Sequence, residues 1–219
     1  MAAEQRARIE RIVEHRPGLR SLFLRTEGEP LAFAPGQFVS LLLPTGPRPP
    51  LTRAYSIASS PEQPGVLELC LDRVPGGLGS GHLFELAVGA EITWTGPWGT
   101  FSLSHAPDVE AVFVADGTGI APVRQMLHRA AATARHPLHL LYAHDAGLFR
   151  DELGRLPHVT IADTSAEHLE RDVRQRWIDA DTRRDREFFV CGVGERVHRL
   201  RDLLRGAGYA RRAVHYERW

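Results

Sequence analysis

The stretch Ala111-Val112-Phe113-Val114-Ala115-Asp116-Gly117-Thr118-Gly119-Ile120-Ala121-Pro122 decides the fold of the second half of the chain. Its continuous apolar run is typical of a parallel strand that is covered on both faces. The glycine-rich turn that follows opens a helix, where backbone N–H groups and the helix dipole favour an anion. Apolar residues then recur at 123, 126, 127, 130, 131 and 134, which places them on one helical face. The stretch predicts a strand, a phosphate-binding turn and a helix.

The turn Gly117-Thr118-Gly119 differs from the dinucleotide-binding fingerprint, because Pro122 stands where the third glycine belongs. Proline is well tolerated in a first helical turn, so a tight turn without a ligand is the alternative interpretation. A second glycine pair lies in Cys191-Gly192-Val193-Gly194, ahead of the last helix. Since ligands bind beyond the carboxyl ends of parallel strands, the two turns together predict one nucleotide crevice. A cysteine such as Cys191, taken alone, is more often a small core residue than a functional thiol.

Strand and helix patterns alternate through the rest of this half. Further strands are expected at 138–143, 159–162, 188–191 and 213–216, and the last helix carries apolar residues at 197, 200, 203 and 204. Such alternation implies right-handed crossovers and an open parallel sheet.

The first hundred residues follow a different pattern. Short apolar stretches at 9–13, 19–24, 38–43, 67–71 and 91–95 are separated by turns that contain Pro and Gly. Strands at this spacing suggest a small antiparallel barrel or sandwich, with one short helix after Gly81 over residues 82–86. We place the domain boundary near residue 106.

Two segments of this half carry residues suited to a cofactor. Arg53-Ala54-Tyr55-Ser56 combines a guanidinium for a phosphate, an aromatic plane for a flat ring and a hydroxyl. The glycine-rich segment from Gly76 to Gly81 offers a second place for a phosphate ahead of the short helix.

Composition excludes several classes of function. All 27 cationic residues are arginine, so the chain has no lysine for a P-loop, a pyridoxal Schiff base or a protein kinase. Balanced charge argues against a nucleic-acid partner, and no apolar run approaches the ~20 residues of a membrane span. Two cysteines cannot form a four-thiolate metal site, and the histidines follow no zinc motif, so we expect no metal. Without a segment of secretory type at the N-terminus, we expect a cytoplasmic protein.

Six motifs together resemble the ferredoxin–NADP reductase family, and the likeness runs from Gly36-Gln37-Phe38 to the last residue. They are Arg53-x-Tyr55-Ser56, the turn at 77–80, Gly96-Pro97-Trp98-Gly99, Gly117-Thr118-Gly119, Cys191-Gly192 and Glu217-x-Trp219. The resemblance implies two domains: an antiparallel Greek-key β-barrel for FAD over residues 1–105, and a Rossmann-like open parallel α/β sheet for NAD(P) over residues 106–219. FMN is the less favoured flavin.

The resemblance also implies a role for each residue of these motifs. Arg53 would contact flavin phosphate, Tyr55 would flank the isoalloxazine, and Ser56 would hydrogen-bond its N5 edge. The backbone of Gly77, Gly79 and Ser80 would hold the pyrophosphate, for which Arg73 is a weaker candidate. In the second domain, Gly117, Thr118, Gly119 and Gly192 would receive the nucleotide, with Cys191 beside the nicotinamide and Glu217 near the hydride path. Trp219 would cover the second flavin face; the alternative is a surface tryptophan that closes a domain interface.

The chain departs from the family pattern at Asp116, where glycine is usual. Its carboxylate would either repel a pyrophosphate or turn away and cap the helix. NADPH-specific members generally carry arginine after the second and third strands of the sheet, whereas Asp145 and Asp163 stand there in this chain, with Arg171 able to reach round. The co-substrate is therefore NADH or NADPH, with NADH favoured.

The resemblance implies a flavoprotein that takes hydride from NAD(P)H onto FAD. The electron acceptor is then external: a ferredoxin serving an oxygenase, or a small flavin or quinone. The alternative is an electron-transfer or flavin-sensing subunit that does not use pyridine nucleotide. Asp116 is the residue that favours this alternative. The oligomeric state is not addressed by the sequence.

Overall fold

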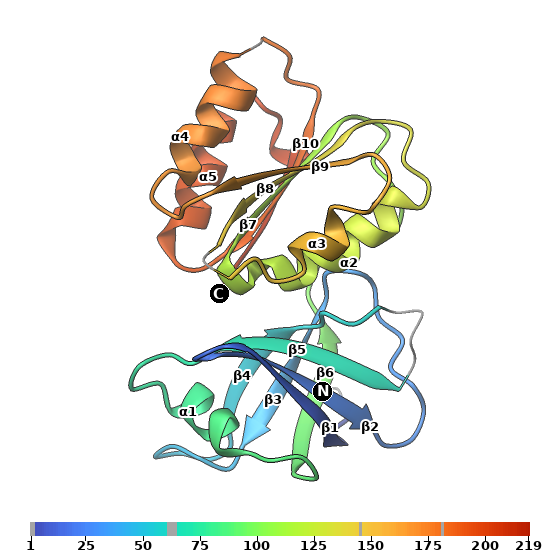
Figure 1. The fold of residues 1–219 in the computed structure, drawn as a ribbon, viewed down its shortest axis with the longest axis vertical. Helices are drawn as coiled ribbons and strands as arrows, with labels where there is room; N and C mark the ends of the chain where they lie inside the picture. Colours follow the sequence, from blue (N-terminus) through green and yellow to red (C-terminus); the bar gives the residue numbers. More distant parts are fainter. Residues whose placement is uncertain (1–2, 61–64, 145, 181) are drawn as a thin grey trace. The chain divides into compact units, whose positions relative to one another are not determined.

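The computed structural model describes residues 3–60, 65–144, 146–180 and 182–219 of the chain. The chain divides between Ser102 and Leu103 into two compact units, each with its own sheet (Figure 1). The first unit is antiparallel and the second is parallel.

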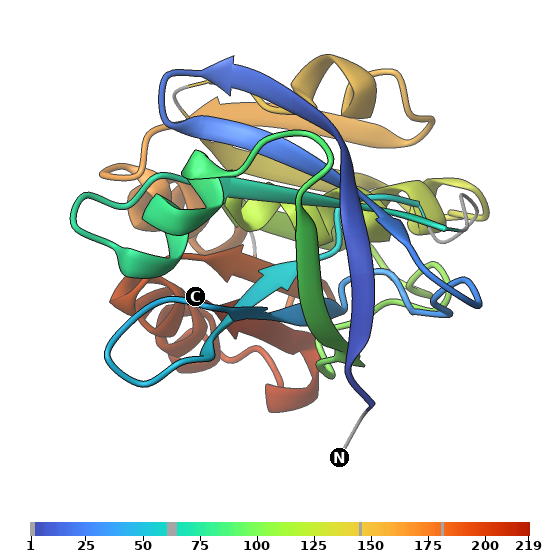
Figure 2. The same cartoon turned by 90° about the horizontal axis from the view of Figure 1, so that it is seen from below.

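The first unit contains six strands and one helix. They are β1 (Gln5–Arg16), β2 (Leu19–Thr26), β3 (Phe38–Leu43), β4 (Leu51–Ser56), β5 (Val66–Asp72), α1 (Leu78–Glu85) and β6 (Glu91–Trp98). The strand order is β4-β3-β6-β1-β2-β5, and every pair is antiparallel. A bridge between Ile57 and Leu69 joins the two outer strands, which closes the sheet into a barrel (Figure 2).

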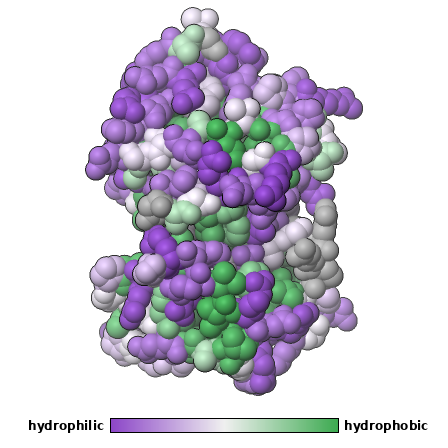
Figure 3. Space-filling model, in the orientation of Figure 1, coloured by the Kyte–Doolittle hydropathy of each residue, from purple (hydrophilic) through white to green (hydrophobic). Residues whose placement is uncertain are grey.

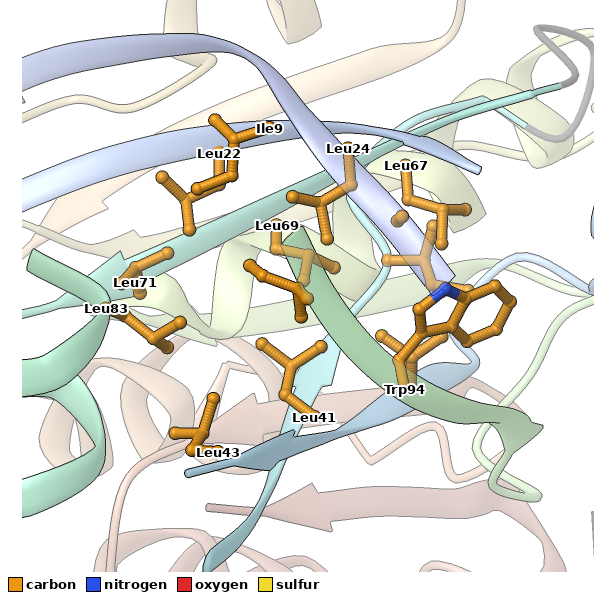
Figure 4. Close-up of a cluster of buried hydrophobic side chains, with 14 residues drawn as sticks. Ile9, Leu22, Leu24, Leu41, Leu43, Leu67, Leu69, Leu71, Leu83 and Trp94 are labelled. Atoms are coloured by element: carbon orange, nitrogen blue, oxygen red, sulfur yellow. The ribbon is translucent and has the colours of Figure 1, made fainter. Parts of the chain in front are cut away.

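Alternating side chains of these strands fill the barrel. Leu22 and Leu24 of β2, Leu41 of β3, Leu69 of β5 and Trp94 of β6 are fully buried and converge on one another (Figure 4). This inward-facing set follows the period of two that strands impose.

The second unit alternates strands and helices. They are β7 (Ala111–Asp116), a 3₁₀ turn (Gly117–Gly119), α2 (Ile120–Ala131), β8 (Leu138–Ala143), α3 (Arg150–Leu153), β9 (Val159–Thr164), α4 (Leu169–Arg174) with a π turn (Gln175–Asp179), β10 (Glu187–Gly192), α5 (Glu195–Gly206), a 3₁₀ turn (Arg211–Ala213) and β11 (Val214–Arg218). The parallel order is β11-β10-β7-β8-β9, and helices cover both faces of the sheet (Figure 1). After β9 the chain crosses to the other side of β7, so the order reverses between β7 and β10, where α/β sheets bind ligands.

Two expectations about helices are corrected. The apolar face of α2 ends within the helix at Ala131, so residue 134 lies beyond it. Helix α1 begins at Leu78 rather than after Gly81, because the N–H of Gly81 bonds to the carbonyl of Gly77 and closes a first turn. Ser80 therefore lies inside the helix, where its hydroxyl accepts a hydrogen bond from the N–H of Val74 at 3.0 Å.

Hydrophilic residues cover much of each unit in the view of Figure 3, with smaller hydrophobic patches between them. Among the helices of the described residues, none is long and apolar enough to span a membrane.

Candidate functional site

In the first unit, β4 positions Arg53, Tyr55 and Ser56. Arg53 is exposed, Tyr55 is half-buried against the barrel core, and Ser56 is 7% exposed. Burial raises the pKa of the Tyr55 phenol to about 12, although the charge of Arg53 acts against this shift. The phenol is therefore neutral and presents an aromatic plane beside a cation.

The Ser56 hydroxyl is the group on this strand that indicates a ligand. Its Oγ is buried and has no hydrogen-bond partner among the described residues. A buried hydroxyl without a partner is unfavourable, and each such group in a native structure calls for an explanation. A ligand with a polar edge at this position would satisfy it.

Helix α1 brings a row of backbone donors next to Arg53. A Cβ built at Gly79 would lie 2.9 Å from Cγ of Arg53, so only glycine allows this approach without displacing the arginine. The N–H groups of residues 78–80 open the helix and have no acceptor within it. A guanidinium and a helix N-terminus thus lie side by side, an arrangement suited to a phosphate. Gly77 is packed against Ser80 Oγ and Val74, so it shapes the turn.

Arg73 directly follows β5 and lies beside α1. It lines a groove of about 580 Å³ whose helical residues are 77, 78, 81, 82 and 85, whereas the buried side of the helix carries Gly79, Ser80 and Leu83. Its guanidinium carbon is 5.8 Å from the centre of the Phe84 ring. Arg73 therefore lines the groove at the start of α1, whereas Arg53 lies against Gly79.

In the second unit, the two glycine turns interlock. A Cβ at Gly119 would lie 2.4 Å from the carbonyl oxygen of Cys191, and one at Gly192 would lie 2.7 Å from Cβ of Asp116. At Gly117 the requirement for glycine has another cause: its φ of +56° favours glycine, although the space around an added Cβ is open. The turns at the ends of β7 and β10 therefore form one continuous surface.

Asp116 neither caps a helix nor stands as an isolated charge. It makes no side-chain capping hydrogen bond, so the capping interpretation is wrong. Its carboxylate is instead paired with the guanidinium of Arg196 on α5. The negative charge that was expected to disfavour a nucleotide is neutralised within the site.

Cys191 lies in register between Ala115 of β7 and Glu217 of β11. Burial raises the pKa of its thiol well above the usual range, the nearby Glu217 carboxyl adds to the effect, and a hydrogen bond with the Trp219 side chain opposes it. The thiol is therefore protonated and acts as a small buried group rather than a nucleophile.

Glu217 and Trp219 complete this surface. Burial raises the pKa of Glu217 to about 7, and its Oε2 has no hydrogen-bond partner within the described residues. Trp219 is fixed by its backbone: its N–H donates to the carbonyl of Gly192 and its carbonyl accepts from the N–H of Gly194, both at 3.1 Å. The structure thus brings Cys191, Glu217 and Trp219 together at the carboxyl ends of β10 and β11.

At the carboxyl ends of β8 and β9, Asp163 holds two partners. Arg150 donates to both of its carboxylate oxygens at 2.7–2.9 Å, and His144 Nε2 lies 3.0 Å from Oδ1. His144 Nδ1 accepts from the N–H of Gly147, so the proton is on Nε2. Hydrogen bonds from Arg150, and then from His144, hold the pKa of Asp163 below its usual value.

The sequence pattern did not indicate Arg150 and His144 at the ends of β8 and β9, or Arg196 after β10. The expected cation Arg171 instead pairs its guanidinium with the neighbouring Asp172. Asp145 lies outside the described residues. No periodicity marks a cation on a loop or helix as the partner of a distant carboxylate, so no signal in the sequence would have found these pairs.

Comparison with known proteins gives matches to flavin-dependent reductases. A family profile described as an oxidoreductase FAD-binding domain matches residues 11–103. The chain is 33% identical over 227 residues to ferredoxin–NADP reductase B of Sorangium cellulosum (strain So ce56), covering 93% of this chain and 92% of that protein. It is 31% identical over 204 residues to the toluate 1,2-dioxygenase electron transfer component of Pseudomonas putida, covering 86% of this chain but 59% of that one.

Solved structures share the fold. A ferredoxin NADP⁺ reductase from Neisseria gonorrhoeae, crystallised with bound FAD and NADP, superposes with a TM-score of 0.84 at 21% identity and covers 100% of this chain and 99% of that one. The ferredoxin reductase in carbazole 1,9a-dioxygenase gives 0.82 at 24% identity, over 99% of this chain and 69% of that one.

Proposed function

This chain belongs to the ferredoxin–NADP reductase family of flavin-dependent oxidoreductases, and from that membership we propose which of its residues carry the reaction. It is an FAD-dependent oxidoreductase that takes hydride from NAD(P)H and passes the electrons to an acceptor outside the chain. The observation that carries the residue assignment is the buried, unpartnered hydroxyl of Ser56 beside Tyr55 and Arg53.

The residues of the first unit fit FAD. Ser56 supplies a hydroxyl for the N5 edge, Tyr55 flanks the ring, and Arg53 neutralises phosphate together with the N–H groups of Gly79 and Ser80. Bound FAD supplies the hydride-accepting chemistry and can release electrons singly or in pairs. Arg73 lines a groove together with Gly77 and Leu78 at the start of α1, and it stays a weaker candidate for the same pyrophosphate.

The second unit supplies the nucleotide site. Gly117, Thr118 and Gly119 present backbone N–H groups to the phosphates. Gly192 allows the second turn to approach Asp116 at the end of β7. Cys191 fills the space beside the nicotinamide as a neutral thiol, while Glu217 holds or releases a proton near pH 7. The assignment of Trp219 as an aromatic cover for the flavin stays a prediction.

We propose NADH as the preferred donor. A 2′-phosphate needs cations at the ends of β8 and β9, and Asp163 already engages both Arg150 and His144 there. An acidic residue at such a position suits the 2′-hydroxyl of NADH.

The acceptor that we propose is a separate ferredoxin of an oxygenase system. The two cysteines of this chain are buried, and a cysteine-held iron–sulfur cluster requires four. The relative from Pseudomonas putida is the electron transfer component of a dioxygenase, which supports this class of acceptor. A small flavin or quinone is the alternative acceptor, and cytoplasmic residence stays a prediction.

Asp116 was the feature that favoured a subunit without pyridine nucleotide. Because Arg196 neutralises its carboxylate, that feature no longer argues against nucleotide binding.

Anaerobic mixing of the FAD-loaded protein with NADH or NADPH tests the proposal. We expect both to bleach the flavin absorbance near 450 nm, with the larger second-order rate constant for NADH. Failure of both nucleotides would contradict the reductase function, and faster reduction by NADPH would contradict the preference. Ser56→Ala, which removes the unpartnered hydroxyl, should slow reduction, whereas Ser59→Ala should not.

A further inference from the structure

The ion pair between Asp116 and Arg196 joins the two glycine turns of the second unit. Asp116 ends β7 directly before the turn at 117–119, and Arg196 is the second residue of α5, directly after the turn that Cys191 begins. The two residues are 80 positions apart in the chain, and Arg196 Nη1 donates to Oδ2 of Asp116. The side chains are 27% and 14% exposed, so the pair lies at the surface of the site and remains accessible to a ligand.

Arg196 differs from the other arginines of its helix in what it contacts. Arg199 pairs with Glu170 of α4, and Arg201 pairs with its neighbour Asp202. Arg196 alone among these three has its carboxylate partner at the nucleotide turn. Since the chain has no lysine, a permanently charged side-chain anchor for a phosphate must be an arginine.

The bond to Asp116 leaves donors of Arg196 for a second acceptor. A guanidinium carries five N–H donors in a rigid fork and binds phosphate oxygens in pairs. One carboxylate on Nη1 restricts the rotation of the long side chain without occupying the rest of the fork. The same ion pair neutralises the carboxylate, so that Asp116 no longer repels an anionic ligand.

We propose that Arg196 is a ligand of the nucleotide's pyrophosphate and that Asp116 positions it. This inference rests on the proposed placement of the phosphates at residues 117–119. It explains why an acidic residue is tolerated at the end of β7, where a carboxylate alone would oppose nucleotide binding. Asp116 is a positioning residue here, since it acts on the phosphate through Arg196.

Binding of ADP-ribose, which has the pyrophosphate but no nicotinamide, tests the inference without any redox step. Calorimetric titration of the oxidised FAD-loaded protein should show a Kd at least ten-fold weaker for Arg196→Gln, and unchanged for the matched Arg199→Gln on the same helix. Arg196→Lys keeps the charge and should bind at least three-fold more tightly than Arg196→Gln.

A double variant separates ligation from simple neutralisation. If Arg196 binds the phosphate, the double variant Asp116→Asn with Arg196→Gln stays several-fold weaker than the wild type, because removal of the unpaired carboxylate restores only part of the lost affinity. Recovery of wild-type affinity in the double variant would show that Arg196 only cancels the charge of Asp116, and would overturn the inference. An unchanged Kd for Arg196→Gln, or a Kd for Arg196→Lys equal to that for Arg196→Gln, would overturn it as well.

Thr118→Glu tests the placement of the phosphates at residues 117–119 independently of Arg196. An added carboxylate in the turn should weaken ADP-ribose at least ten-fold. If it does so while Arg196→Gln has no effect, the placement holds and the role of Arg196 is wrong; if it has no effect, the placement itself is wrong.

Discussion

Glu217 is the residue whose chemistry depends most on its surroundings. Burial raises the pKa of its carboxyl from 4.5 to about 7, and no charged group contributes to that shift. Because the native state binds this proton more tightly than the unfolded state, the contribution to stability is fully present below pH 4.5 and is lost as the pH rises through 7.

The pH dependence of stability therefore changes when this carboxyl is removed. We expect Glu217→Gln to unfold at higher urea concentration than the wild type above pH 7, with the difference shrinking toward pH 5. The gain at pH 8.5 should be about 1–2 kcal/mol after allowance for partial exposure. Glu167→Gln, which replaces an exposed carboxylate in the same unit, should show no such trend. Equal curves for Glu217→Gln and the wild type would mean that Glu217 ionises normally.

Asp163 controls which hydrogen-bond donors at the ends of β8 and β9 are available to a nucleotide. Replacement by asparagine removes the charge that holds Arg150 and His144, so both become available to a 2′-phosphate. We expect Asp163→Asn to raise the ratio of kcat/KM for NADPH to that for NADH about ten-fold, which corresponds to about 1.4 kcal/mol. Asp202→Asn breaks a comparable pair with Arg201 on α5 and should leave the ratio unchanged. A ratio that stays constant in Asp163→Asn would place the 2′ position elsewhere.

At the scale of elements, the ends of β7 and β10 depend on close backbone approach. Gly119 has ordinary helical angles, with φ of −58°, so alanine would be acceptable there on conformational grounds. Its Cβ would nevertheless lie 2.4 Å from the Cys191 carbonyl oxygen, which no side-chain movement relieves. The spacing of the two strand ends is therefore what requires glycine.

Gly119→Ala should destabilise the protein by about 1–3 kcal/mol, as expected for overpacking, and should weaken nucleotide binding because the turns separate. Gly206→Ala on α5, where a Cβ meets nothing within 4 Å, should be neutral or slightly stabilising. Urea unfolding of both variants measures the change in stability, and titration with NAD⁺ measures the change in nucleotide affinity. Wild-type stability for Gly119→Ala would show that the turns are not tightly coupled.

The regular elements were largely predictable. Apolar runs with a period of two or of 3.6 located most strands and helices, and the expected strands Phe38–Leu43 and Leu138–Ala143 match the observed bounds. The start of α1 was not predictable, because glycines at 77, 79 and 81 are typical of a loop. Hydrogen bonds between Gly81 and Gly77 and between Val74 and Ser80 hold the helix there.

On the scale of the whole molecule, each unit has its own core and its own proposed ligand. The barrel core surrounds Leu41 and Leu69, and the parallel sheet packs Val112 and Val190 against its helices. FAD alone should slow hydrogen exchange in β4 and α1, and NAD⁺ alone should slow it at residues 116–119 and 191–194. Hydrogen exchange of the full chain with each ligand checks this. Protection by FAD confined to the groove beside Arg73 would contradict the placement of its phosphates at Arg53.

The two-part architecture, the order of the motifs and the residues of each turn could be predicted from the amino-acid sequence. These features are local, because strand and helix periods, turn residues and short motifs all lie within a few positions. Three contacts became visible in the folded chain alone: Arg196 neutralises Asp116, Gly119 packs against Cys191, and Asp163 binds Arg150 and His144. The first two pairs join different βα units, and the third joins a loop and helix to a strand. Charge pairing and close packing depend on how near two groups lie in space. For residues far apart in the chain, that distance is set by the folded structure and is not encoded in a local sequence pattern.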